Sequence, residues 1–186
     1  AAFLFSAAML SGCSDPAAGF GQPETDSSAA ADGGTESAGS VSNEGYLRVH
    51  FIDVGQGDSI LIQAGEQAML VDAGTNESGS VVTEYLRSLN ITKLDYLIGT
   101  HPHEDHIGGL DDVIHSFEIG TVIMPDVSHT TQTYEDVLDA LLEKNLTVTA
   151  PHPGDTYSIG DASFTVLSPS AAIAEQAAEN GDLNNL

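Results

Sequence analysis

The chain has very little cysteine and very few basic side chains. Its single cysteine among 186 residues is Cys13, so no internal disulfide and no thiolate metal cluster can form within it. Lys and Arg together number 4 against 28 Asp and Glu, which gives a formal net charge of −24. This imbalance argues against a nucleic-acid binder that neutralises phosphates with basic side chains. Any recognition of phosphate would have to use metal ions.

The first residues lack an apolar run long enough to cross a bilayer. Residues 1–13 are small and apolar, whereas a spanning helix needs about 20 apolar residues. We interpret 1–13 as a truncated lipoprotein signal peptide, because Leu10-Ser11-Gly12-Cys13 resembles a bacterial lipobox. Cys13 would then carry the lipid and anchor the protein to the outer face of the cell membrane. The alternative is an ordinary buried cysteine beside a truncated helix.

Residues 14–45 contain mainly Ala, Gly, Ser, Asp and Glu, with no Lys or Arg. Such a segment cannot bury enough apolar surface to fold, so we expect a disordered acidic linker. A folded domain is predicted from residue 46 to 186, where apolar periodicity begins. The chain does not start with Met and ends at Leu186 without a clear terminal element, so we expect a piece of a longer protein.

The most informative stretch of the domain is the segment 101–109, which reads His-Pro-His-Glu-Asp-His-Ile-Gly-Gly. Imidazole and carboxylate groups are ligands for zinc, manganese and iron. An extended step from His101 to His103 would place both rings on one side of the backbone. Asp105 and His106, on a following bend, could face the same point, so one loop could serve two adjacent cations. A polar surface loop that is rich in histidine is the alternative.

The apolar periodicity predicts a mixed sheet covered by helices, which is the α/β class. Expected strands are residues 47–52, 59–64, 67–71, 94–100, 121–124, 146–150, 157–159 and 162–167. Expected helices are residues 81–89, 109–117 and 134–144. The histidine-rich loop follows a buried strand and precedes a helix, which is the usual position of ligand sites in α/β sheets.

Three motifs carry a family resemblance. His101-x-His103-x-Asp105-His106 resembles the metal motif of metallo-β-lactamase-fold hydrolases, and Leu70-Val71-Asp72-Ala73-Gly74 is similar to their earlier turn. The segment 51–59, Phe-Ile-Asp-Val-Gly-Gln-Gly-Asp-Ser, resembles the ComEC-like branch, which is associated with DNA-uptake competence.

This resemblance implies an αββα four-layer sandwich, of which the chain would hold the N-terminal half and somewhat more. It implies two divalent metal ions, zinc foremost and manganese as an alternative. His101 and His103 would bind the first ion, and Asp105 and His106 the second, with Asp105 also serving catalysis. The implied activity is hydrolysis by metal-activated water. The ComEC-like motif favours a phosphodiester substrate, with DNA as a candidate.

The match to the superfamily breaks after the predicted strand 162–167. A further His is usual there, whereas this chain has Ser168 and Ser170. The remaining ligands are expected beyond Leu186. We therefore expect the 186-residue piece to bind metal weakly, to expose apolar core surface and to be inactive alone.

Two acidic residues are candidates for supporting the metal ligands. Asp72 and Asp58 would orient ligands from neighbouring turns, with simple turn chemistry as the alternative for each. Four other histidines have weaker assignments. His50 is expected to be half-buried or at the surface, His115 exposed, His129 near the mouth of the site, and His152 a poor substitute for the absent ligand.

Two other functions compete with phosphodiester hydrolysis. The first is hydrolysis of a different bond, such as a β-lactam, lactone or thioester. The second is a surface-binding lipoprotein without catalysis, against which the intact set of ligand-type residues in 101–106 argues.

Overall fold

The computed structural model describes residues 3–6 and 45–180. Cys13, almost all of the predicted linker 14–45 and the segment 181–186 lie outside the described residues. The interpretations of the lipobox and of the linker therefore stay predictions. Among the described residues, no helix is long and apolar enough to cross a membrane.

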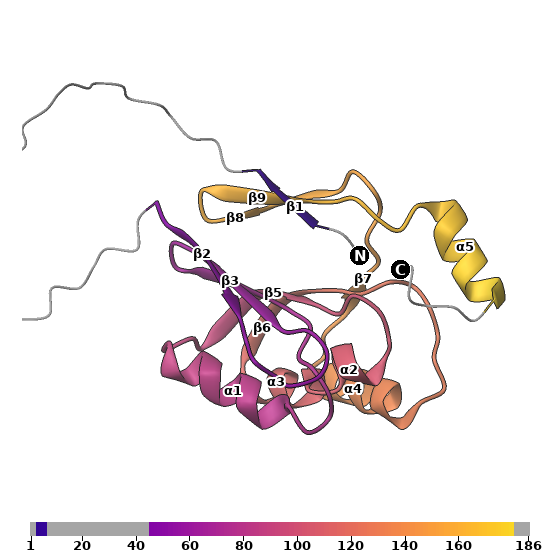
Figure 1. Cartoon of the computed structure of the whole chain (residues 1–186), viewed down its shortest axis with the longest axis horizontal. Coiled ribbons are helices and arrows are strands. Elements are labelled where there is room, and N and C mark those ends of the chain that lie inside the picture. The colour runs from indigo at the N-terminus through magenta and orange to yellow at the C-terminus, as the bar shows by residue number, and fades with distance from the viewer. Residues whose placement is uncertain (1–2, 7–44, 181–186) are drawn as a thin grey trace, which may run out of the picture. The chain divides into compact units, whose positions relative to one another are not determined.

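The centre of the domain is a six-stranded mixed sheet with the strand order β2-β3-β4-β5-β6-β7 (Figure 1). The first three strands are antiparallel and are β2 (Leu47–Phe51), β3 (Ile60–Ala64) and β4 (Gln67–Val71). The next three run parallel to β4 and are β5 (Lys93–Ile98), β6 (Glu118–Ile123) and β7 (Val148–Thr149). Parallel neighbours bring the carboxyl ends of β4, β5 and β6 to one edge of the sheet.

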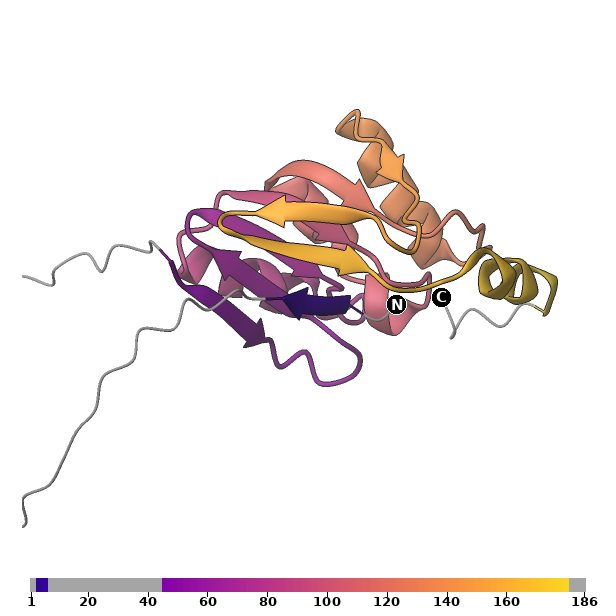
Figure 2. The same ribbon diagram turned by 90° about the horizontal axis from the view of Figure 1, so that it is seen from above.

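Helices cover one face of this sheet (Figures 1 and 2). They are α1 (Gly79–Ser88), α2 (Glu104–Ile107), α3 (Leu110–Ser116) and α4 (Gln132–Glu143). Leu70 and Leu97 of the sheet pack in one buried cluster with Leu86, Val113 and Val137 of the helices. Amphipathic helices on an apolar sheet face account for this layer, because each buries its apolar stripe there.

The opposite face of the central sheet packs against a second, three-stranded sheet with the order β1-β9-β8. Its strands are β1 (Phe3–Ser6), β8 (Thr156–Ile159) and β9 (Ala162–Val166). Phe164 and Ile159 pack with Ile62, Met69 and Ile98 in a second buried cluster between the sheets. The described residues thus form one helical layer and two sheet layers.

The sequence predicted most of these elements and missed four features. One helix was expected over 109–117, but a separate helix α2 precedes α3 and includes Asp105 and His106. The strand expected over 146–150 is only the two-residue β7. No strand was expected at 3–6, where β1 pairs with β9, and no helix at 171–180, where α5 (Ala171–Asn180) follows β9.

Candidate metal centre

The candidate centre lies at the carboxyl ends of β4 and β5. Asp72 follows β4 directly, and Thr100 and His101 follow β5 after Gly99. The two strands are parallel neighbours with Val71 opposite Ile98, so their following residues meet at the sheet edge. Here the backbone of Asp72 has a φ of 56°, a left-handed conformation that is uncommon for a residue other than glycine. Uncommon backbone conformations of this kind cluster at functional sites.

Asp72 is 1% exposed, and its carboxylate accepts three hydrogen bonds. Oδ1 accepts the Thr100 backbone N–H at 2.8 Å, and Oδ2 accepts the Thr100 hydroxyl at 2.6 Å. His106 Nδ1 lies 2.8 Å from the same Oδ2. Buried carboxylates are costly unless hydrogen bonds satisfy them, and these three contacts do so. The carboxylate therefore connects the end of β5 to the histidine-rich segment.

Three imidazoles of the segment 101–106 lie together. The ring centroid of His101 is 4.7 Å from that of His103 and 4.0 Å from that of His106. His129, from the segment before α4, adds a fourth ring with its centroid 6.0 Å from that of His103. The three rings of this segment therefore lie together, and His129, which was expected near the mouth of the site, lies beside His103.

Backbone contacts explain how one short segment gathers these rings. His103 is extended, with φ −83° and ψ 147°, and its carbonyl accepts the N–H groups of His106 and Ile107. The chain therefore turns directly into α2. The His106 carbonyl in turn accepts the Ala73 N–H at 2.8 Å, which holds α2 against the turn after β4.

Residues 55–58, which read Gly-Gln-Gly-Asp, lie against the candidate centre. The Asp58 N–H donates to the Asp105 carbonyl at 3.3 Å, and the Asp58 carbonyl accepts the Gly74 N–H at 2.9 Å. Gly57 has a φ of +86°, and a Cβ built on it would lie 1.7 Å from the Asp105 carbonyl oxygen. Glycine is required at this position because the backbone of α2 passes so close. All three sequence motifs thus meet at one place.

The pKa values of His101 and His106 shift in opposite directions. Burial, followed by the neighbouring His106 and His103, lowers the pKa of His101 to about 4. The hydrogen bond that His106 donates to the Asp72 carboxylate is the main cause that raises the pKa of His106. A neutral imidazole at His101 has a free nitrogen lone pair at pH 7, which is the form that binds a metal.

The predicted acidic residues occupy different environments. Asp105 lies in α2 and is partly exposed, and its charge contributes to raising the pKa of His106. Asp58 has a 65% exposed side chain, with Oδ2 3.9 Å from His106 Nδ1. Glu104 is exposed and accepts the Asn76 N–H at 3.0 Å, so its carboxylate is engaged with the segment before α1.

The other histidines have partners elsewhere. His50 contacts the Tyr85 hydroxyl and Gln63, and His115 lies 3.2 Å from Glu143. His152 is 78% exposed and pairs with Asp155 in a loop. Within the part of the chain that the structure describes, these three histidines therefore lie apart from the ring cluster.

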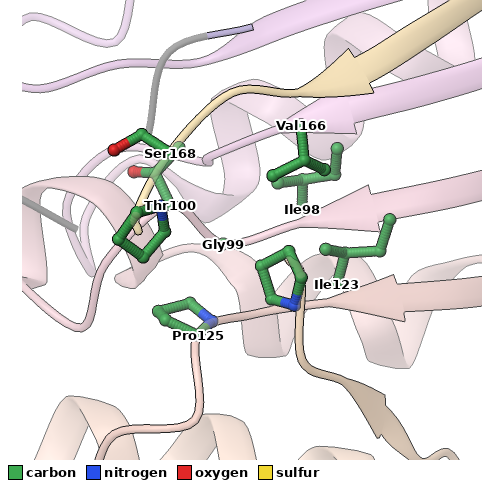
Figure 3. A pocket seen from close by; sticks show the side chains of 9 residues that line it. Ile98, Gly99, Thr100, Ile123, Pro125, Val166 and Ser168 are labelled. Carbon is green, nitrogen blue, oxygen red and sulfur yellow. The ribbon is translucent and has the colours of Figure 1, made fainter. Parts of the chain in front are cut away.

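Thr100 is a residue of the site that no sequence motif indicated. Its only sequence signal is its position between the apolar strand and His101. A small cavity of about 10 Å³ lies beside it, lined by Ile98, Gly99, Thr100, Ile123, Pro125, Pro151, Val166, Ser168 and Pro169 (Figure 3). This cavity holds no more than about one water molecule, so it cannot be a substrate pocket.

The donor chemistry of the centre fits divalent metal ions, since imidazole nitrogens and a carboxylate are zinc ligands. A histidine that binds a metal usually donates its other ring N–H to a carboxylate, a carbonyl or water, and His106 pairs with Asp72 in this way. Among the described residues, however, no three side chains of the His, Cys, Asp or Glu type already stand in coordinating positions. An ion held by these residues would require their side chains to change torsion angles.

Comparison with known proteins identifies the class of this fold and site. The family model of the metallo-beta-lactamase superfamily matches residues 52–171, and the chain belongs to this superfamily. The resemblance stated from the three motifs is confirmed.

One similar protein supports the resemblance to the ComEC-like branch. ComE operon protein 3 of Bacillus subtilis (strain 168) is 32% identical over 149 residues, which are 70% of this chain and 19% of that protein. The chain thus spans about a fifth of the curated relative that it matches.

Solved structures share the fold at low sequence identity. MEM-A1, a subclass B3 metallo-beta-lactamase from a soil metagenome library, matches with a TM-score of 0.50 and 16% identity, over 64% of this chain and 48% of that chain. A HARLDQ motif mutant of the Cronobacter sakazakii metallo-beta-lactamase matches with a TM-score of 0.50 and 15% identity, over 64% and 49% of the two chains. These likenesses confirm the fold and carry no argument about substrate.

Proposed function

We propose that the chain is the metal-binding part of a hydrolase that cleaves phosphodiester bonds with metal-activated water. The observation that carries the proposal is the cluster of His101, His103 and His106, held by the buried Asp72 carboxylate. The ComEC-like motif in residues 51–59, together with the likeness to ComE operon protein 3, favours a phosphodiester over an acyl bond, with DNA as a candidate substrate. The net charge of −24 requires that the phosphate be bound through cations.

His101 and His103 would hold one divalent ion, and Asp105 and His106 a second, with zinc or manganese as the metals. When bound, such ions lower the pKa of a coordinated water and polarise the phosphoryl oxygen. Asp72 fixes the His106 ring through Nδ1, so Nε2 of that ring faces away from the carboxylate. Gly57 and the Asp58 N–H hold the backbone of Asp105 in place.

We also propose a location at the cell envelope, with Cys13 as a lipid anchor to the outer face of the membrane. The name of the competence-operon relative and the lipobox-like Leu10-Ser11-Gly12-Cys13 support this placement. Labelling of cells with a clickable fatty acid would test it, because Cys13→Ser should remove both the label and the membrane retention. Unchanged labelling in that variant would contradict the anchor.

The proposed activity is tested with the longest natural form of the protein, purified without metal and then supplied with zinc or manganese. A chromogenic phosphodiester and a chromogenic β-lactam are assayed in parallel. Metal-dependent release from the phosphodiester is expected. Turnover of the β-lactam alone would place the activity on acyl bonds, and absence of bound metal would exclude the hydrolase.

Asp105 provides a sharper test within this assay. Asp105→Asn should lower metal-dependent turnover by more than about a hundredfold, because a ligand matters at least as much as the groups that support it. The adjacent Glu104→Gln is the matched control, since Glu104 faces the Asn76 N–H instead of the cluster. Circular dichroism should show the same fold in both variants. Equal turnover in Asp105→Asn and the parent would remove this carboxylate from the mechanism.

A further inference from the structure

The Thr100 hydroxyl lies between the buried Asp72 carboxylate and the first imidazole of the cluster. Its oxygen is 2.6 Å from Asp72 Oδ2 and 3.1 Å from His101 Nδ1. The backbone N–H of Thr100 also donates to Asp72 Oδ1, so the residue is held at two points by one carboxylate. A β-branched side chain has few χ1 rotamers, which further limits where this hydroxyl can point.

The number of protons determines the direction of these hydrogen bonds. A carboxylate that accepts from two donors at Oδ2 and from one at Oδ1 is acceptor-only, so the single hydroxyl proton of Thr100 is donated to Asp72. Toward His101 the same oxygen can then only accept. His101 Nδ1 must therefore carry a proton for the 3.1 Å contact to be a hydrogen bond.

We propose that Thr100 is a positioning residue that fixes His101 as the Nδ1–H tautomer and leaves Nε2 as its metal-binding atom. Asp72 then controls two rings of the cluster, His106 by a direct hydrogen bond and His101 through the Thr100 hydroxyl. The inference about metal binding rests on the proposed function. The inference about the tautomer does not, because it concerns the protein without metal.

The test measures the tautomer directly in metal-free protein. Long-range ¹H–¹⁵N spectra of histidine-labelled protein distinguish protonated Nδ1 from protonated Nε2, and the His101 signals are assigned by their loss in His101→Gln. His101 is expected in the Nδ1–H form. Thr100→Val removes the hydroxyl at nearly equal volume and should shift His101 toward the Nε2–H form, whereas His106 stays Nδ1–H through Asp72. Thr100→Ser should restore the parent tautomer.

Zinc affinity provides the second measurement. Thr100→Val should weaken zinc binding by about 10- to 100-fold, the usual effect of losing a group that orients a metal ligand. Thr100→Ser should bind within about threefold of the parent protein. The control is Thr83→Val, since Thr83 is a buried threonine of α1 whose hydroxyl donates to the Ser80 carbonyl, away from the centre.

Each outcome decides one of the two claims. His101 in the Nε2–H form in the parent, or an unchanged Nδ1–H form in Thr100→Val, would overturn the role of Thr100. If Thr100→Val does not fold, the parent and Thr100→Ser spectra still decide the tautomer. The expected tautomers without any zinc binding by the parent would leave the positioning role standing and reject the proposed function instead.

Discussion

At the scale of single residues, Asp72 combines burial of a charged group with an uncommon backbone conformation. It is almost fully buried, has a positive φ and supplies acceptors to two other segments. A backbone of this kind costs about 1–3 kcal/mol, which the surrounding hydrogen bonds must offset. The conformation aims the carboxylate at the end of β5 instead of along the strand. The buried Asp72 carboxylate thus holds Thr100 and His106 by hydrogen bonds.

Gly57 and Gly55 allow a matched test of how closely the first motif approaches α2. Both have positive φ, +86° and +77°, but a Cβ meets the Asp105 carbonyl only at Gly57 and meets nothing within 4 Å at Gly55. Gly57→Ala should lower the free energy of unfolding by about 1–3 kcal/mol more than Gly55→Ala, because its methyl group overpacks against backbone. Urea denaturation measures this difference, and zinc titration should show weaker binding for Gly57→Ala alone. Equal effects of the two changes would mean that the loop does not support Asp105.

At the scale of elements, the parallel strands β4, β5 and β6 form the platform of the site. Leu70 and Leu97 are fully buried in the cluster beneath the helices, and Ile98 lies in the cluster between the sheets. Strands buried on both faces explain the nearly continuous apolar runs of the sequence. The same burial fixes the register of β4 against β5, and therefore the distance between Asp72 and Thr100.

Leu97 tests how strongly this platform depends on packing. Leu97 is 0% exposed in β5, whereas Leu142 of α4 is 74% exposed. Leu97→Ala should lower the free energy of unfolding by about 2–5 kcal/mol, because it leaves a cavity in the core. Leu142→Ala should change it by no more than about 0.5 kcal/mol. Equal midpoints of denaturation for the two variants would contradict the assigned burial.

The secondary structure was predictable wherever a whole element had one clear periodicity. The runs 60–64, 67–71 and 93–98 and the amphipathic segment of α4 gave correct elements for this reason. Helix α2 was not predicted, because three of its four residues are polar and Ile107 alone cannot form an apolar stripe. Its helical form depends on contacts with the turn after β4, which lie far away in sequence.

At the scale of the whole molecule, apolar surface remains exposed along the edge strand β2. Leu47, Val49 and Phe51 are 36%, 45% and 79% exposed, although their partners on β3 face the cluster between the sheets. In the described domain, β2 is thus where apolar surface of the kind expected from the sequence is exposed. Exposed apolar edge strands promote association, so aggregation of the isolated piece stays a prediction.

Metal binding should raise the stability of the whole domain. Zinc at a free concentration about one hundred times its dissociation constant should add about 2.7 kcal/mol to the free energy of unfolding, because it binds the folded state. Differential scanning calorimetry should show a higher melting temperature with zinc and its reversal by EDTA. A His101→Ala/His106→Ala double variant keeps the acidic charges and should show no shift. A shift of equal size in that variant would indicate unspecific binding to the acidic surface.

The sequence by itself determined the class of fold, the position of the histidine-rich segment after a buried strand and the family to which the chain belongs. These depend on periodicity and on motifs whose residues are close neighbours in the chain. The tertiary structure decided that Asp72, Thr100, His101 and His106 form one hydrogen-bonded unit and that Gly57 lies against Asp105. Segments tens of residues apart meet there only because parallel strands pack in one register between two apolar layers, which no local pattern specifies.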